Sequence, residues 1–217
     1  SGRDKKREAL SRAQIEENMA HYKKEAAKIV VPSKTEVRYN SEWLAKLSLK
    51  DMIELCSQFT VARLLERDMF QRRIERGEEI WVAELLYPLL QGYDSVALNV
   101  DLEVGATDQT FNMLIGRKLQ KIYHKKEKFI LTTPYLLGLD GRKMSKTYHN
   151  TINLDDSPKE MYGKVMSIRD ELIPQYFELL TDLPLSEIEE IKEKMLHNKI
   201  NPIEVKSRLA REIVTIY

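Results

Sequence analysis

Apolar residues recur at helical spacing in the first part of the chain. Between residues 11 and 30 they fall three or four positions apart on one face, which predicts an amphipathic helix. Pro32 is expected to end that helix, because proline cannot continue the helical hydrogen-bond pattern. The short stretch from Glu36 to Tyr39 then has the character of a β-strand.

The next stretch contains several helix starts and stops. Ser41 is a candidate N-cap, and Ser48 stands three residues before Asp51, which is the spacing of a capping box. Another helix is predicted to open at Thr60 and to run to about residue 76, where Gly77 supplies a C-terminal stop.

The middle of the chain predicts a β-α-β unit. Residues 79–98 carry a long apolar helical pattern, in which Pro88 predicts a kink or a new first turn. Strands are expected from Ala97 to Val104 and from Lys128 to Leu137. The helix between them would carry a core stripe of Phe111, Leu114, Ile115, Leu119 and Ile122. The order strand, helix, strand implies a parallel sheet.

The last third of the chain is predicted to be helical. Ser186 and Glu189 have the spacing of a capping box, and Asn201 and Pro202 are typical of the N-cap and first position of a final helix. The fold class that follows is α/β, with a parallel sheet and a helical C-terminal part.

Composition narrows the function classes. Of the 217 residues, 42% are hydrophobic and 32% are charged, which is the composition of a folded protein. The 35 basic and 34 acidic side chains leave a net charge of +1, which excludes a histone-like polycation. A net charge near zero does not exclude nucleic-acid binding, because a local patch of basic residues can contact phosphates.

The cysteine count and the lengths of the apolar runs indicate in which compartment the protein works. Cys56 is the single cysteine, so no intramolecular disulfide and no cysteine-based zinc site can form, and we expect no metal site. A reducing, cytoplasmic compartment is the natural interpretation. Because no run of 18 apolar residues occurs, we also expect no membrane span.

Tyr87, Gln91 and Asp94 form the first constellation of chemically useful residues. They stand at positions i, i+4 and i+7 of a predicted helix, so they share one face over roughly 10 Å. A phenol, an amide and a carboxylate on one face of an apolar helix indicate a polar binding site. A polar seam between packed elements is the competing interpretation, and the spacing alone favours the seam.

The sequence GATDQ, at residues 105–109, is the second constellation. In open α/β sheets, ligands bind beyond the carboxyl ends of strands, and glycine allows a ligand to approach the backbone. Gly105 therefore marks a candidate ligand-binding turn, and Asp108 is a carboxylate suited to ribose hydroxyls. Asp108 as a simple helix cap is an equally good interpretation of the residues alone.

The sequence KMSKT, at residues 143–147, is the third. Lys143 and Lys146 stand three apart in a loop after a predicted strand, and they can hold phosphate groups as point charges. Such a loop can close on a transition state and open afterwards. A lysine pair in a loop is usually only solvated, but this string is much rarer than its charge.

These motifs carry a family resemblance. KMSKT resembles KMSKS, the signature of class I aminoacyl-tRNA synthetases, and Thr147 keeps the hydroxyl of the usual serine. With YPLLQGYD at residues 87–94 and GATDQ in the same order, the chain is similar to bacterial tyrosyl-tRNA synthetases. The likeness covers essentially its whole length, including LDDSPKEMYGKVMSI at residues 154–168.

The resemblance implies a partial Rossmann-like sheet of the class I synthetases with added helical parts. The catalytic portion would occupy residues 1–150, including a helical insertion at about residues 45–85. A helical subdomain would follow at residues 151–217. Dimerisation is expected from the family, with the helical stretch Phe59–Leu86 as candidate surface, although its apolar residues could equally be core.

The resemblance also assigns residues to the amino-acid substrate. Tyr87 and Gln91 would hold the amino group of tyrosine, and Gln109 would lie near its carboxylate. Asp94 would accept the phenolic hydroxyl. Phenylalanine would then leave a buried carboxylate unpaired, which is how tyrosine would be selected.

A second set of residues is assigned to ATP, which is expected as its Mg²⁺ complex. Gly105 and Asp108 would line the ribose side, although Ala106 replaces a glycine common in the family. The lysine loop would hold the phosphates, with both lysines as catalytic groups: Lys143, Ser145, Lys146 and Thr147. Arg3 and Arg7 align with cations on the pyrophosphate side, with a solvated basic tail as the alternative.

The implied chemistry has two steps. The carboxylate of tyrosine attacks the α-phosphate of ATP and pyrophosphate leaves; the tyrosyl group then passes to a ribose hydroxyl at the end of tRNA(Tyr). No covalent enzyme intermediate is needed, so catalysis would rest on positioning and charge stabilisation.

One family signature is missing. The chain's histidines are too far apart to form the HIGH-like sequence of class I synthetases: His21, His124, His149 and His197. The resemblance implies that the upstream segment with this signature and the C-terminal RNA-binding domain lie outside the chain. We therefore expect the 217 residues by themselves to be inactive.

Two other functions compete with tyrosine activation. Tryptophanyl-tRNA synthetase shares the fold and the lysine signature, but Tyr87, Gln91 and Asp94 favour tyrosine. The other is a non-catalytic homologue that binds RNA or a protein partner through the lysine-rich run at residues 121–129. A solvated helix end is the simpler interpretation of that run.

Overall fold

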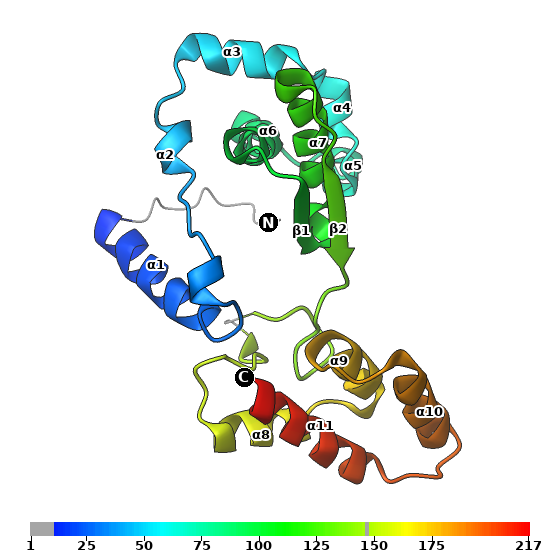
Figure 1. The fold of residues 1–217 in the computed structure, drawn as a ribbon. Helices are drawn as coiled ribbons and strands as arrows, with labels where there is room; N and C mark the ends of the chain where they lie inside the picture. Colours follow the sequence, from blue (N-terminus) through cyan, green and yellow to red (C-terminus); the bar gives the residue numbers. More distant parts are fainter. Residues whose placement is uncertain (1–10, 146–147) are drawn as a thin grey trace. The chain divides into compact units, whose positions relative to one another are not determined.

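A computed structural model describes residues 11–145 and 148–217, which form two compact units. The described part of the first unit is residues 37–134; that of the second is residues 11–36 and 135–217 (Figure 1). Each unit has its own cluster of buried apolar side chains. The domain boundary expected near residue 150 stays a prediction.

The first unit combines short helices with one β-α-β unit. In chain order its elements are α2 (Ser41–Leu44), α3 (Leu49–Ser57), α4 (Val61–Leu65), α5 (Asp68–Glu75), α6 (Val82–Leu98), β1 (Leu102–Ala106), η2 (Thr107–Gln109), α7 (Thr110–His124) and β2 (Phe129–Thr133). The two strands pair in parallel, from Leu102 opposite Phe129 to Ala106 opposite Thr133. The predicted parallel sheet and the α/β fold class are therefore confirmed.

Helices α6 and α7 pack closely against each other, and α7 also contacts both strands. Glycines permit this approach: a Cβ atom on Gly92 of α6 would lie 3.0 Å from the backbone nitrogen of Gly116 on α7. Lys128, which is only 1% exposed, then ties the layers together. Its ammonium donates to Ser95 Oγ on α6 at 2.8 Å and forms an ion pair with Glu103 on β1.

Three sequence predictions about strands and about Pro88 need correction in this unit. Residues 36–39 are extended but form no strand, since no described segment pairs with them. The strand expected from Ala97 begins only at Leu102, because α6 continues to Leu98 and ends at Asn99 in the left-handed conformation. Pro88 starts no new helix; it lies inside α6 as part of its buried face.

The predicted helix caps are confirmed in part. Ser48 and Asp51 form the capping box of α3, and Thr60 caps α4. The single helix expected from Thr60 to residue 76 is instead two helices, α4 and α5, and Gly77 follows α5 with a positive φ of 67°. Ser41 is not an N-cap but the first residue of α2.

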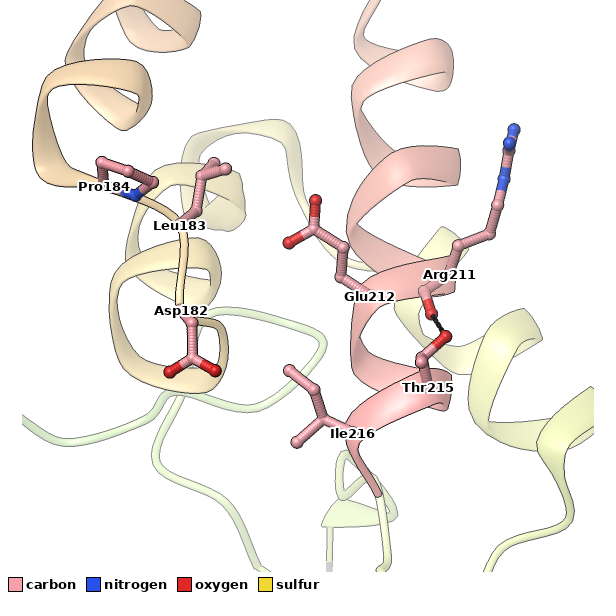
Figure 2. A pocket seen from close by; sticks show the side chains of 7 residues that line it. All are labelled: Asp182, Leu183, Pro184, Arg211, Glu212, Thr215 and Ile216. Carbon is pink, nitrogen blue, oxygen red and sulfur yellow. Dashed lines mark hydrogen bonds between the residues drawn. The ribbon is translucent and has the colours of Figure 1, made fainter.

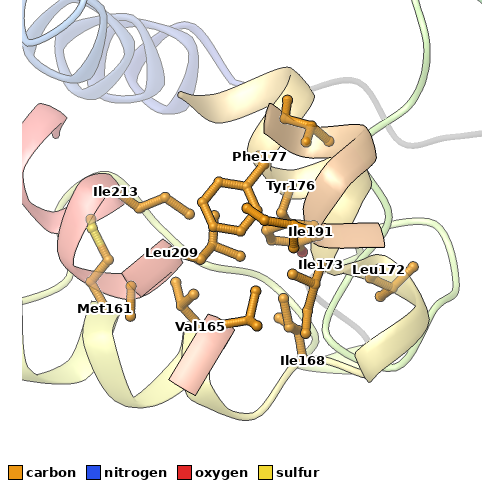
Figure 3. Close-up of a cluster of buried hydrophobic side chains, with 13 residues drawn as sticks. Met161, Val165, Ile168, Leu172, Ile173, Tyr176, Phe177, Ile191, Leu209 and Ile213 are labelled. Carbon is orange, nitrogen blue, oxygen red and sulfur yellow. The ribbon is translucent and has the colours of Figure 1, made fainter. Parts of the chain in front are cut away.

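The second unit is helical, as the sequence predicts. Its elements are α1 (Arg12–Ala26), η1 (Pro32–Lys34), α8 (Pro158–Met166), η4 (Asp170–Leu172), α9 (Ile173–Leu180), α10 (Leu185–Leu196) and α11 (Pro202–Ile216). Its core joins α8, α9, α10 and α11 around Tyr176 and Phe177, both fully buried (Figure 3). In the described residues, no helix is long and apolar enough to cross a membrane.

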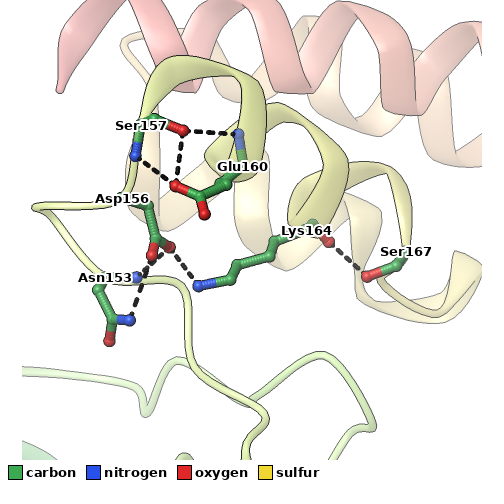
Figure 4. Close-up of polar contacts among 6 residues, drawn as sticks. All are labelled: Asn153, Asp156, Ser157, Glu160, Lys164 and Ser167. Carbon is green, nitrogen blue, oxygen red and sulfur yellow. Dashed lines mark hydrogen bonds and ion pairs between the residues drawn. The ribbon is translucent and has the colours of Figure 1, made fainter.

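Local hydrogen bonds fix where the helices of this unit begin. The Ser157 hydroxyl accepts the backbone N–H of Glu160 and so caps α8, and the Glu160 carboxylate in turn accepts the backbone N–H of Ser157 (Figure 4). Asp156 pairs with Lys164 at 2.5 Å. Asn201 caps α11 as predicted. The capping box predicted from Ser186 is wrong, because α10 begins one residue earlier, at Leu185 after Pro184.

Candidate active site

One side of α6 carries three of the predicted site residues. Tyr87, Gln91 and Asp94 all lie within this helix, as their spacing predicts. The Tyr87 side chain is 63% exposed, whereas Gln91 and Asp94 are half-buried. The helix therefore offers an open phenol at one end and a sheltered carboxylate at the other.

Asp94 is held by a residue far away in the sequence. The indole Nε1 of Trp43, on α2, donates a hydrogen bond of 2.7 Å to Asp94 Oδ1. Burial raises the pKa of Asp94 above its usual value, and the nearby Glu103 adds to this, while hydrogen bonds from Trp43 and Asn40 oppose it. Two side chains of the protein, Trp43 and Asn40, thus act on this carboxylate.

The side chains of Gln91 and Gln109 are joined by Asn112. The Nδ2 group of Asn112 donates to Gln91 Oε1 at 2.8 Å and to Gln109 Oε1 at 3.3 Å. Gln109 Nε2 in turn donates to Asp108 Oδ2 at 3.0 Å. The structure therefore connects the polar face of α6 with the GATDQ turn through a single side chain.

Gly105 lies where β1 runs into this turn. A Cβ atom there would come within 3.1 Å of Met113 Sδ on α7, so the absence of a side chain lets the strand end approach the helix closely. Asp108 is exposed in the short η2 helix and does not cap α7, whose N-cap position is taken by Gln109. The interpretation of Asp108 as a simple helix cap is therefore wrong.

Arg67 is a cation near this site that the sequence motifs did not indicate. Its guanidinium carbon lies 5.1 Å from the ring centroid of Phe70 and 5.7 Å from that of Phe111. Burial lowers the pKa of Arg67, and the opposite charges of Glu84 and Asp108 counteract the shift. An anionic group near Asp108 and Tyr87 would therefore meet a partly desolvated positive charge.

The lysine loop belongs to the second unit and forms a tight hairpin. Leu137 and Lys143 pair as an antiparallel bridge, and Gly141 takes a positive φ of 79° at its turn. The exposed Lys143 ammonium lies 4.5 Å from the ring centroid of Tyr135 and donates to its hydroxyl at 3.3 Å. Lys146, Thr147, Arg3 and Arg7 lie outside the described residues.

Asn150 organises the described part of that loop from inside. Only 3% of it is exposed, and its Nδ2 donates to Asp140 Oδ1 at 2.8 Å and to the Lys143 carbonyl at 3.3 Å. Its Oδ1 accepts the backbone N–H of Ser145 at 2.9 Å. The hydrogen bonds from Asn150 and Arg142 hold the pKa of Asp140 well below its usual range.

A pocket in the second unit lies apart from the predicted site residues. It has a volume of about 390 Å³, lies between the segment that precedes α10 and the end of α11, and is mostly apolar (Figure 2). Its lining residues are Asp182, Leu183, Pro184, Arg211, Glu212, Thr215 and Ile216. Because none of them belongs to the three motifs, the pocket is not the candidate site.

Sequence reasoning missed Trp43, Arg67 and Asn112 for different reasons. Trp43 lies 51 residues from Asp94, and no local pattern relates the two. Arg67 is one of many arginines in a charged helical stretch. Asn112 could have been noticed in the sequence, because it is a polar residue next to Phe111 of the predicted core stripe.

The site in the first unit suits a ligand with several different polar groups. Gln91 and Gln109 present oriented carboxamides, Asp94 presents a sheltered acceptor, and Arg67 adds positive charge. This polar cluster on a β-α-β frame, in a chain that also carries a KMSKS-like sequence, agrees with the class I aminoacyl-tRNA synthetases.

Comparison with known proteins agrees with this class. The family described as tRNA synthetases class I (W and Y) matches residues 1–217. The chain is 49% identical to a tyrosine–tRNA ligase of Thermotoga maritima, covering 100% of this chain and 54% of the relative. It is 50% identical to one of Cupriavidus pinatubonensis, covering 99% and 52%. The chain thus spans about half the length of these curated relatives.

Solved structures share the fold. Tyrosyl-tRNA synthetase of Archaeoglobus fulgidus, complexed with L-tyrosine, superposes with a TM-score of 0.74 at 21% identity, covering 95% of this chain and 72% of that one. A mitochondrial tyrosyl-tRNA synthetase of Aspergillus nidulans gives 0.70 at 24% identity, covering 99% and 67%. The chain belongs to the class I tRNA synthetases for tryptophan and tyrosine, and its resemblance to bacterial tyrosyl-tRNA synthetases is confirmed.

Proposed function

We propose that this chain is part of an enzyme that activates L-tyrosine with ATP and transfers it to tRNA(Tyr). The observation that carries the proposal is the connection through Asn112 between Gln91, which shares α6 with Tyr87 and Asp94, and the Asp108–Gln109 turn. In this proposal Tyr87 and Gln91 bind the amino group, Gln109 the carboxylate and Asp94 the phenolic hydroxyl. Trp43 holds Asp94 in place.

ATP is bound in the proposed enzyme by the turn after β1 and by the lysine loop. Gly105 allows close approach of the nucleotide, and Asp108 accepts ribose hydroxyls. The phosphates are held by the loop residues Lys143, Ser145, Lys146 and Thr147, with further contacts from Arg3 and Arg7. Magnesium arrives with ATP as part of the substrate. The protein's contribution is positioning and stabilisation of negative charge.

We propose that the enzyme acts as a homodimer in the cytoplasm. Large apolar side chains between Phe59 and Leu86 lie on the surface of the first unit, among them Val61, Ile74 and Val82, which are 61%, 49% and 72% exposed. An exposed apolar surface of this kind is typical of a protein interface. Sedimentation velocity of the full-length protein over a range of concentrations tests the dimer.

The lysine-rich run does not favour a purely RNA-binding function. Lys121 pairs with Glu127, Lys126 pairs with Asp101, and Lys128 is buried against Glu103. Charges already neutralised by protein contribute less to phosphate binding. Tyrosine activation therefore remains the single function proposed.

The test is ATP–pyrophosphate exchange by the full-length gene product with tyrosine, tryptophan or phenylalanine. Exchange with tyrosine alone is the expected result, and exchange with tryptophan instead would show the wrong substrate. The 217-residue chain by itself is expected to give none. Lys146→Ala in the full-length protein should lower turnover by about 100-fold or more, because a transition-state contact is lost. Unchanged turnover would remove Lys146 from the mechanism.

A further inference from the structure

The Asn112 side chain lies buried between two glutamines of the proposed tyrosine site. It is 2% exposed and sits in the first turn of α7, where its Nδ2 group donates to the carboxamide oxygens of both Gln91 and Gln109. An NH₂ group has two hydrogens, so one side chain can satisfy both contacts at once. Two elements, α6 and the turn after β1, are thereby joined at one atom.

This arrangement leaves a polar atom unsatisfied. Asn112 Oδ1 is buried, and it has no hydrogen-bond partner within residues 11–145 and 148–217. A buried carbonyl without a partner costs free energy, so such groups are rare in folded proteins. Turning the amide around would not help, because its oxygen would then face the two glutamine oxygens. The protein therefore keeps a costly orientation, and what that orientation secures is the direction of both glutamines.

The direction of the glutamines matters for the ligand. With Oε1 bound to Asn112, the Nε2 group of Gln109 faces Asp108, 3.0 Å away, and keeps a second hydrogen for an external acceptor such as a carboxylate. Gln91 Oε1 accepts one hydrogen from Asn112 and keeps a lone pair for a cationic donor. Without Asn112, either carboxamide could rotate and present the wrong group.

We propose that Asn112 is a positioning residue that orients Gln91 and Gln109 toward the amino and carboxylate groups of the amino-acid substrate. This inference rests on the proposed function. It differs from a packing role, because packing alone would not depend on which atom of the side chain faces the glutamines.

The chain offers a matched control for this distinction. Gln120 lies on the same helix, is fully buried, and donates through Nε2 to Asn99 Oδ1 at 2.8 Å. Its own oxygen also lacks a partner among the described residues. Gln120→Leu therefore removes a buried carboxamide of the same helix away from Gln91 and Gln109.

The experiment uses the full-length protein with Asn112→Leu, Asn112→Ser and Gln120→Leu. Binding of three compounds is compared: L-tyrosine, tyramine, which lacks the carboxylate, and 3-(4-hydroxyphenyl)propionate, which lacks the amine. Both Asn112 variants are expected to weaken tyrosine binding about tenfold and the two analogues less, so that the preference for tyrosine falls. The preference for tyrosine over phenylalanine should not change, since Asp94 is untouched.

The outcomes separate the two proposals. Unchanged preferences in Asn112→Ser, which is smaller than asparagine and introduces no clash, would overturn the positioning role even if leucine is not tolerated. An equal loss of preference in Gln120→Leu would also overturn it. If the unaltered protein binds tyrosine no better than either analogue and shows no exchange, the proposed function fails instead.

Discussion

Asp94 shows at the scale of one residue how burial and hydrogen bonding act in opposite directions on one carboxylate. Desolvation works against its charge, and the indole of Trp43 supports it. The carboxylate is therefore held by protein donors although burial works against its charge. A further hydroxyl donor would relieve part of the desolvation cost, which an apolar ring end cannot do.

The raised pKa of Asp94 has a measurable consequence for stability. Its pKa in the folded chain lies above the usual 3.8, so the folded state binds a proton there more tightly than the unfolded state. The free energy of unfolding should therefore decrease as the pH rises from about 4 through the folded-state pKa. Asp94→Asn should remove this decrease.

Thermal unfolding of both proteins across pH tests this expectation. The melting temperature of Asp94→Asn should equal that of the parent at acidic pH and exceed it as Asp94 ionises. Tyrosine-dependent exchange by the full-length variant should fall at least about tenfold. Asp155→Asn, at an exposed position, controls for the loss of one negative charge. A difference in melting temperature between the two proteins that does not vary with pH would contradict the assignment of this effect to the pKa of Asp94.

At the scale of elements, the close contact between α6 and α7 brings residues of the proposed site together. Gly92 on α6 and Gly116 on α7 leave no room for side chains: a Cβ on Gly116 would come within 2.7 Å of Ser95 Oγ. This close approach brings Gln91 on α6 within reach of Asn112 on α7. The glycines are therefore a condition for the polar connection between the two helices.

Gly92→Ala and Gly163→Ala should shift stability in opposite directions. A Cβ at Gly92 would meet Ile115 Cγ2 at 2.8 Å, so we expect a loss of about 1–3 kcal/mol in the free energy of unfolding. Gly163, in α8, has nothing within 4 Å, so alanine there should add about 1 kcal/mol through helix propensity. Urea denaturation of both variants measures the effects, and destabilisation by Gly163→Ala would be inconsistent with the packing described.

At the scale of the whole molecule, one face of the sheet is exposed among the residues that the structure describes. Four apolar side chains share that face and are 50%, 60%, 68% and 53% exposed: Leu102, Val104, Phe129 and Leu131. Parallel sheets are normally covered on both faces, and α7 is a helix of the described chain that contacts these strands. The relatives are about twice as long as this chain.

The 217-residue chain should therefore self-associate and bind an apolar dye. ANS fluorescence and sedimentation velocity measure this, and the double variant Val104→Lys with Leu131→Lys should lower both dye binding and association several-fold. Lysine at Leu49 and Ile53, exposed on α3, provides a control with the same added charge. An equal decrease in the control would assign the effect to charge and not to the sheet face.

Local features of this fold follow from the sequence alone. The capping box at Ser48 and Asp51, the cap at Asn201 and the stop at Gly77 depend on residues within four positions of one another, so short-range hydrogen bonds and allowed backbone angles fix them. The order of strand and helix also follows from periodicity. The spacing of Tyr87, Gln91 and Asp94 also predicts, from local periodicity alone, that they share one helix.

The tertiary structure decided which segments and side chains contact each other. The extended residues 36–39 have strand character but no partner strand in the described parts of the chain, and apolar character let α6 run to Leu98 where a strand was expected. Trp43 reaches Asp94 across 51 positions, and Asn112 reaches Gln91 across 21. The sequence determines local conformation because the hydrogen bonds of caps and turns join residues that are close along the chain. The contacts of Trp43 and Asn112 depend instead on how closely distant elements pack, and only the folded chain decides that.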